Sequence, residues 1–400
     1  MAVSRARPCD LVFLIPGFLG FERFGNFGYF ADRVTAALRA CLEDRLGRTV
    51  YVVPVPILPT GSFAQRQSAL VKTLLNRMSV FDCVGNVHLV GHSTGGVDAH
   101  LLTLSEPVGQ VSWASHDGVD ARPLRERLRS VISIGSPHQG TCLADDPVAQ
   151  FLASPKHAPG GAVPFGNLLL KLMVSAASDV STSETLISVA REGHKVWKFF
   201  FEVLRWNDLI EALRPDRMEE LYQRAVPDLP RVRRASFVTI AGLPDALDPA
   251  PGPDTDAFFD DMWMRTSGQH TGSMLKGEAV RPTLRLLEEA VASPERVIIS
   301  RHARLPAALD LASNDGVVNT ARQLINPRDP AELAAVVVAD HFDVVGYYDR
   351  SVWVTDAEGL DRPHQVMAGL LHSGSCFGDD EFFKLYRQVA HVILHASESS

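Results

Sequence analysis

The segment 91–95, Gly-His-Ser-Thr-Gly, limits the folding of this chain more than any other feature. It follows Val87–Val90, an apolar run of strand length, and precedes a segment with helical character that begins near Gly95. A Cβ at either flanking glycine would clash with a neighbouring strand or helix, so the pattern predicts a tight turn that lifts a hydroxyl out of a sheet. We therefore predict that Ser93 is a nucleophile.

Several other short apolar runs have the length and β-branched content of strands that are buried on both faces of a parallel sheet. They are Leu11–Ile15, Val50–Val55, Val131–Ile134, Phe237–Ile240 and Ala334–Ala339. Between and after them, apolar residues recur at three- to four-residue steps, as in helices that lay one stripe on a sheet, at about 29–46, 70–78 and 382–393. The alternation predicts an α/β fold with a mostly parallel central sheet flanked by helices.

Two long stretches interrupt this alternation. They divide the chain into a first core part at 1–138, a largely helical cap or lid at 139–235, and a second core part at 236–400 with a loop insertion near 243–281. Long excursions in a compact domain are usually lids or binding loops. The apolar residues of the cap fit either its own core or a lid over an acyl pocket; they include Leu168–Met173, Trp197, Phe199–Phe201, Leu204, Trp206, Leu209 and Ile210.

The composition narrows the classes of partner and the compartment. The formal charge of −8 comes from interspersed carboxylates, and Lys and Arg form no dense run that could follow phosphates, which argues against nucleic acid. No apolar stretch is long enough to span a bilayer. The apolar run after Arg5 and Arg7 is too short for a signal peptide, and the five cysteines show no disulfide or zinc spacing. We therefore expect a cytoplasmic protein, or a secreted one if a leader was removed.

A serine nucleophile needs a base and an orienting carboxylate, in the chain order Ser, acid, His for this kind of sheet. His341 comes directly after the last predicted strand, and Asp315 lies in an Asn-Asp-Gly turn that can hold a carboxylate on a fixed backbone. Asp310 and Asp343 are the alternative acids. We predict Asp315 and His341 as the partners of Ser93.

An oxyanion that forms during attack by Ser93 needs backbone N–H donors. The N–H of Thr94, at the start of the predicted helix, is the first candidate. The second should come from the loop after an early strand, and Gly17 and Gly20 let the loop at 16–21 approach closely. We assign this second donor to the N–H of Phe18.

At several separated segments the sequence resembles the true bacterial lipases of the α/β-hydrolase superfamily. The loop at 16–21 is similar to their His-Gly-x-x-Gly-Phe oxyanion loop, 91–96 to their Gly-His-Ser-x-Gly-Gly turn, and 134–141 to their Pro-His-x-Gly segment. The segments 314–317 and 341–343 resemble their Asn-Asp-Gly and His-Leu-Asp motifs. The resemblance implies an α/β-hydrolase fold and the roles of Ser93, Asp315 and His341 as nucleophile, acid and base.

The chain also departs from that family. Pro16 stands where the family has His before the oxyanion glycine, and the loop after His341 lacks the expected amide ligand. Asp343 matches a calcium-binding position of the family, but a hard cation needs six or more oxygens, so one matching carboxylate is a weak calcium candidate.

The resulting hypothesis is a serine carboxylic-ester hydrolase, a lipase or esterase, that works through an acyl-enzyme on Ser93 without a cofactor. Its substrates would be lipid-like esters with hydrophobic acyl chains, or hydrophobic polyesters; the sequence identifies no protein partner. An acyltransferase or thioesterase would use the same three residues. A hydrolase fold that serves only as a binding module is a further alternative, which the presence of all three residue types argues against.

Overall fold

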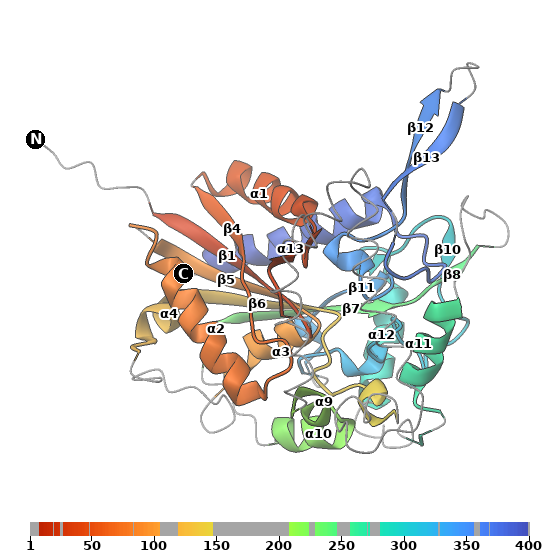
Figure 1. Ribbon diagram of the computed structural model, residues 1–400, viewed down its shortest axis with the longest axis horizontal. Helices are drawn as coiled ribbons and strands as arrows, with labels where there is room; N and C mark the ends of the chain where they lie inside the picture. Colours follow the sequence, from red (N-terminus) through yellow and green to blue (C-terminus); the bar gives the residue numbers. More distant parts are fainter. Residues whose placement is uncertain are drawn as a thin grey trace, which may run out of the picture.

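The computed structural model describes most of the chain outside the predicted cap (Figure 1). The residues described are 8–18, 20–24, 27–47, 49–82, 84–104, 119–146, 208–223, 229–245, 257–269, 271–272, 281–326, 329–355, 361–367 and 369–398.

A seven-stranded, all-parallel sheet forms the centre of the molecule, in the order β4-β1-β5-β6-β7-β11-β9. Its strands are β1 (Cys9–Ile15), β4 (Val50–Pro54), β5 (Val84–His92), β6 (Leu128–Ile134), β7 (Arg233–Ile240), β11 (Leu333–Val338) and β9 (Val297–Ile298). The six strands predicted from apolar runs are all members of this sheet, which confirms the α/β class. The two-residue β9 at the edge is too short to give a pattern in the sequence.

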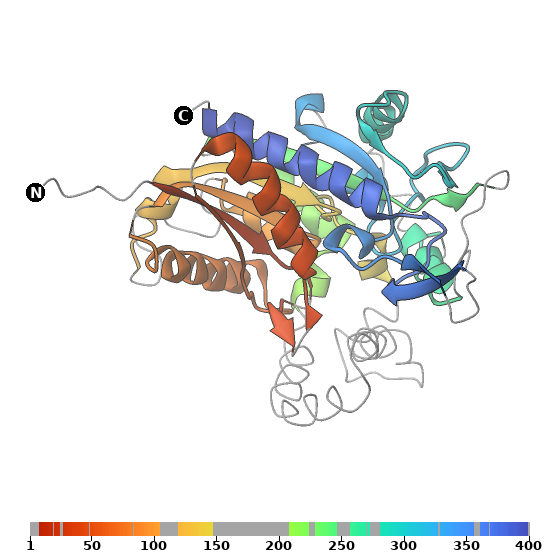
Figure 2. The same ribbon diagram turned by 90° about the horizontal axis from the view of Figure 1, so that it is seen from above.

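Helices cover both faces of the sheet and bury it. On one face α1 (Asp32–Leu46) and α13 (Asp379–Glu398) lie side by side (Figure 2) and share a core cluster with β1, β5 and β6. On the other face α2 (Phe63–Met78) and α4 (Arg122–Arg127) pack against the opposite side chains of the same strands. α3 (Thr94–Leu101) follows β5 directly, and α12 (Arg281–Val291) packs near β11.

Local sequence explains where two of these helices begin and end. Ser62 and Gln65 form a reciprocal capping box at the start of α2, which satisfies two backbone N–H groups of its first turn. α1 ends at Gly47, whose φ of 60° is a left-handed conformation that glycine adopts without a Cβ penalty.

Of the predicted cap, only the two ends are described. η1 (Cys142–Asp145) follows β6, and α9 (Asp208–Ala212) and α10 (Pro215–Gln223) precede β7. The apolar residues predicted for the cap between 168 and 206 lie outside the described residues. The division into core and cap stays a prediction, and its boundary at 235/236 falls inside β7.

Smaller elements lie in the connections between the strands and helices of the core. α11 (Ala257–Ser267) lies in the predicted loop insertion, and β8 (Leu243–Pro244) pairs with β10 (Ala303–Arg304). β2 (Arg23–Phe24) and β3 (Phe27–Gly28) form one hairpin, and β12 (Arg350–Thr355) and β13 (Asp361–Met367) form another, which projects from the body in Figure 1. Short 3₁₀ turns are η5 (Thr320–Arg322), η6 (Pro330–Glu332) and η7 (Asp343–Val345). None of the helices described here has the length and apolar character to cross a bilayer.

Candidate active site

Ser93 lies on a strained turn between β5 and α3, as the sequence predicts. Its φ of 54° and ψ of −134° are unusual for a residue with a side chain, and a conformation of this kind costs about 1–3 kcal/mol. The turn is held by the hydrogen bond from Ser93 N to Ile134 O at 3.0 Å. Since strained backbone persists only where the surroundings impose it, this turn is a candidate functional feature.

Glycine is needed on both sides of Ser93 because backbone lies too close for a side chain. A Cβ on Gly91 would stand 2.4 Å from the backbone of Gly95, and a Cβ on Gly95 would stand 2.3 Å from Ile15 O. The Gly-x-Ser-x-Gly pattern is therefore a packing requirement of the turn, and the strand and helix around it have the predicted order.

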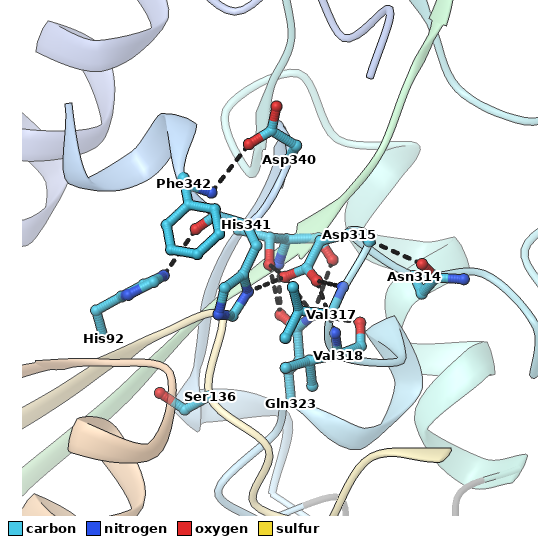
Figure 3. A network of polar contacts seen from close by, with 12 residues as sticks. His92, Ser136, Asn314, Asp315, Val317, Val318, Gln323, Asp340, His341 and Phe342 are labelled. Carbon is cyan, nitrogen blue, oxygen red and sulfur yellow. Dashed lines mark hydrogen bonds and ion pairs between the residues drawn. The ribbon is translucent and has the colours of Figure 1, made fainter. Parts of the chain in front are cut away.

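Asp315 and His341, which the sequence places 26 residues apart, are in direct contact. Nδ1 of His341 lies 2.9 Å from Oδ2 of Asp315, and both side chains are buried (Figure 3). The His341 backbone N–H also donates to Asp315 O at 3.0 Å. A carboxylate only accepts, so Nδ1 carries the proton and Nε2 of His341 is left with a lone pair that can act as a base.

Four further groups donate to the Asp315 carboxylate. Oδ1 accepts from the backbone N–H of Val317 at 3.0 Å and of Val318 at 2.8 Å. Oδ2 accepts from the Thr239 hydroxyl at 2.5 Å and from the Gln323 amide at 3.4 Å. These donors fix the orientation of the carboxylate and therefore that of the imidazole ring.

The alternative acids have other partners. Asp310 accepts from the backbone of Ala312 and Ser313 in its own turn. Asp343 accepts from the backbone N–H of Asp340 at 2.9 Å. Neither is hydrogen-bonded to the ring of His341, so Asp315 is the carboxylate that the structure pairs with it.

The turn at Ser93 and the Asp315–His341 pair meet at the same edge of the sheet. In the parallel register His92 is opposite Ile134, which places Ser93 beside Gly135. A Cβ on Gly135 would lie 3.5 Å from Asp315 Oδ2 and 3.6 Å from His341 Nδ1. Among these described residues, no hydrogen bond joins Ser93 Oγ to His341. Hydrogen bonds of this kind often form only when substrate binds.

The predicted oxyanion loop also reaches Ser93. A Cβ on Gly17 would lie 2.6 Å from Ser93 Cβ and 3.0 Å from its Oγ, so the backbone before Phe18 passes directly over the serine. Hydrogen bonds from Gly20 N to Gly17 O at 3.0 Å and from Ile57 N to Gly20 O at 2.8 Å hold this loop. Thr94 begins α3, where backbone N–H groups have no acceptor within the helix.

A buried ion pair joins the segments next to this loop. Arg66 and Asp98 are fully buried, with Arg66 Nη2 2.6 Å from Asp98 Oδ2. The same guanidinium donates to Pro59 O at 3.0 Å, to Leu58 O, and to Thr94 Oγ1 at 3.3 Å. Arg66 thereby joins α2, the start of α3 and the segment that holds Gly20.

The calcium candidate Asp343 stands in a turn of described residues and stays a prediction. The described part of the chain contains no group of three or more His, Cys, Asp or Glu side chains placed to hold a metal ion. Asp340 and Asp343 instead bond to the backbone of their own turn. Burial raises the pKa of Asp340 from 3.8 to about 8, and burial next to Asp340 raises the pKa of Asp343 as well.

Sequence reasoning missed the residues that support the pair. Thr239 lies within a predicted strand, and its place beside Asp315 depends on the sheet order, which no local pattern gives. Tyr29 and His92 were missed too: Tyr29 hydroxyl lies 2.7 Å from His92 Nδ1, and His92 Nε2 lies 2.8 Å from His341 O. His92 stands inside the Gly-x-Ser-x-Gly segment, and this position is the one signal that pointed to it.

Comparison with known proteins gives matches to structures alone. No protein-family model and no curated protein sequence matches the chain. One similar solved structure is a lipase of Staphylococcus hyicus, with 14% identity over 98% of this chain and 96% of that chain and a TM-score of 0.43. Another is EstA of Clostridium botulinum, with 17% identity over 84% of this chain and 83% of that chain and a TM-score of 0.42. A third is lipase 1 of Pelosinus fermentans, with 18% identity over 84% of this chain and 93% of that chain and a TM-score of 0.42.

These likenesses are at low identity, and the assignment of the fold rests on the sheet order and on the turn between β5 and α3. A parallel sheet in this order, with a strained serine after β5 and a histidine after β11, is the arrangement of the α/β-hydrolase fold. The chain has this fold, and the solved structures named above include two bacterial lipases.

Proposed function

We propose that this protein is a serine carboxylic-ester hydrolase in which Ser93 is the nucleophile, His341 the base and Asp315 the residue that orients the base. The observation that carries the proposal is the buried pair of His341 and Asp315 beside a serine in a strained conformation. An imidazole with Nδ1 bound to a carboxylate has its Nε2 available for a proton.

In the first half of the reaction, Nε2 of His341 takes the proton of Ser93 as Oγ bonds to the ester carbonyl carbon. The carbonyl oxygen becomes an oxyanion, which the N–H groups of Phe18 and Thr94 stabilise, each by about 3 kcal/mol. Cleavage of the bond to the alkoxy oxygen then releases the alcohol, which leaves with the proton from His341.

In the second half, a water molecule gives a proton to His341 while its oxygen attacks the acyl carbon on Ser93. The tetrahedral intermediate collapses, the acid leaves, and Ser93 Oγ regains its proton from His341. Asp315 stabilises the imidazolium that forms in each half. No cofactor takes part in these steps.

Apolar residues near the turn favour esters with hydrophobic acyl chains. Phe18 packs against a cluster that includes Val97 and Leu101 of α3 and Leu209 of α9. On the other side, the exposed Trp263 of α11 lies near the acid, because its backbone oxygen accepts from the side chain of Asn314 at 3.2 Å. Lipid-like esters and hydrophobic polyesters both fit such surroundings.

Transfer of the acyl group to an alcohol, or cleavage of a thioester, would use the same residues. The acyl-enzyme is identical in these reactions, and the molecule that resolves it decides the product. Product analysis with and without an added alcohol separates hydrolysis from transfer.

The proposal is tested by hydrolysis of p-nitrophenyl esters from acetate to palmitate. We expect wild type to be active and Ser93→Ala to lose about 10⁶-fold in kcat, as nucleophile deletions do in serine enzymes. Ser133→Ala is the matched control, because Ser133 is also buried and lies on the next strand. A fluorophosphonate should bond to Ser93 Oγ with loss of fluoride, and mass spectrometry locates the adduct.

Two results would overturn the proposal. One is an equal rate for wild type and Ser93→Ala, which would favour a binding module with the hydrolase fold. The other is a fluorophosphonate adduct on a serine other than Ser93 in a protein that hydrolyses the esters.

A further inference from the structure

The base His341 is held from a second direction that the reaction above does not use. Its backbone oxygen accepts from Nε2 of His92 at 2.8 Å, and the two imidazole rings are 4.6 Å apart (Figure 3). Nδ1 of His92 lies 2.7 Å from the Tyr29 hydroxyl. All three side chains are buried.

The direction of this hydrogen-bond chain follows from the donor inventory of its members. A backbone carbonyl only accepts, so Nε2 of His92 must carry a proton. Burial, and then the charge of nearby His341, lower the pKa of His92 well below its usual range, so the ring is neutral and Nδ1 has a lone pair. The Tyr29 O–H therefore donates to His92 Nδ1, and His92 Nε2–H donates to His341 O.

Tyr29 also lies at the oxyanion loop. A Cβ on Gly17 would stand 2.5 Å from the Tyr29 hydroxyl and 2.6 Å from Ser93 Cβ, so the hydroxyl, the loop and the nucleophile surround one point. The tyrosine ring is fixed by edge contacts with Phe21 and Phe30 at centroid distances of 5.6 and 5.3 Å. A rigid group thus connects the loop of the predicted oxyanion hole to the base.

We propose that Tyr29 and His92 are positioning residues that hold the backbone of His341 at a fixed distance from Ser93 and Gly17. The proposal rests on the function proposed above, because it assigns a purpose to the same base. Asp315 fixes the ring of His341 through Nδ1, and the chain from Tyr29 fixes the backbone that carries the ring.

Two substitutions at position 92 separate the two hydrogen bonds. In His92→Gln the side-chain amide reaches the position of Nε2 and can still donate to His341 O. In His92→Asn the shorter amide reaches only the position of Nδ1. It can still accept a hydrogen bond from the Tyr29 hydroxyl, but it loses the hydrogen bond to His341 O. We expect kcat to fall at most about threefold in His92→Gln and 10- to 100-fold in His92→Asn, with KM little changed, because a shift of about 1 Å in a reacting group can cost 10² in rate.

Tyr29→Phe removes the first donor and leaves the ring in place. We expect about a tenfold loss of kcat, which corresponds to about 1.4 kcal/mol and lies within the range for one net hydrogen bond. Tyr386→Phe is the matched control: its hydroxyl is equally buried and donates to Val344 O at 2.7 Å in the same loop, but it does not touch His341 or His92. Tyr386→Phe should keep wild-type kcat.

A second measurement does not depend on activity. The ¹⁵N spectrum of histidine-labelled protein should show His92 as the neutral tautomer with its proton on Nε2, and Tyr29→Phe should shift the Nδ1 resonance. Wild type with His92 charged, or with the proton on Nδ1, would overturn the inference whatever the enzyme does.

The kinetic outcome separates the two proposals. If Ser93→Ala keeps full activity, the proposed function fails, and the ¹⁵N spectrum still decides the hydrogen-bond chain. If Ser93→Ala is inactive while His92→Asn and Tyr29→Phe have wild-type kcat, the function stands and the positioning role is wrong. Equal losses in Tyr29→Phe and Tyr386→Phe would also refute it, because they would show general loosening of the loop.

Discussion

Replacement of Gly17 by alanine tests the proposed oxyanion loop more directly than any substitution of Ser93, Asp315 or His341. The added Cβ would stand 2.6 Å from Ser93 Cβ and 2.5 Å from the Tyr29 hydroxyl. Carbon atoms in contact prefer about 3.5–4.0 Å, so the gap is short by about 1 Å. Neither neighbour can withdraw easily, because Ser93 is on a strained turn and Tyr29 is packed between aromatic rings.

The loop itself must therefore move by about 1 Å, and the N–H of Phe18 moves with it. A displacement of this size costs about 10² in rate, and complete loss of one oxyanion donor costs about 10²–10³. We expect kcat of Gly17→Ala to fall about 10²-fold. Forcing one methyl group into a packed site should also lower the free energy of unfolding by about 1–3 kcal/mol.

The assay is the initial rate of p-nitrophenyl butyrate hydrolysis, with kcat and KM determined separately, together with urea unfolding. Gly378→Ala is the matched control, because its Cβ would meet only Glu381 Oε2 at an ordinary 3.4 Å. A folded Gly17→Ala protein with wild-type kcat would show that this loop does not border the reacting atoms.

Three further outcomes follow from buried charges. Asp315→Asn should lower kcat by about 10⁴, as the same change does in serine proteases, and a fall below tenfold in the ester assay would remove Asp315 from the site. Asp98→Ala leaves the Arg66 guanidinium buried without its carboxylate, and urea unfolding should show a free energy of unfolding lower by about 3–5 kcal/mol. A loss under 1 kcal/mol would mean that water reaches Arg66. Burial raises the pKa of both Asp340 and Asp343, so the folded protein should lose stability as pH rises from about 4 to about 8. In urea titrations at pH 5 and pH 8, Asp343→Asn should make this loss of stability smaller. An equal loss in wild type and Asp343→Asn would contradict the prediction.

The sequence predicted the parts of the site that lie on local patterns. Ser93 is flanked by glycines between a strand and a helix, and His341 follows a predicted strand, whereas Asp315 was assigned from its Asn-Asp-Gly turn and its place in the chain order. In a parallel sheet the carboxyl ends of neighbouring strands meet at one edge. The strand end at His341, the turn at Asp315 and the resemblance to the lipases together predicted that the two residues meet, with Asp310 and Asp343 as alternatives.

The supporting residues could not be predicted in this way, because their contacts cross the sheet or the loops above it. Tyr29 and His92 are 63 positions apart, and His92 and the His341 oxygen are 249 apart. Nothing near Tyr29 in the sequence distinguishes it from the aromatic residues beside it, which only fill the core. Its role depends on one hydrogen bond in the folded protein, so the measured effect of Tyr29→Phe, compared with the control Tyr386→Phe, shows whether the rate depends on that bond or on packing alone.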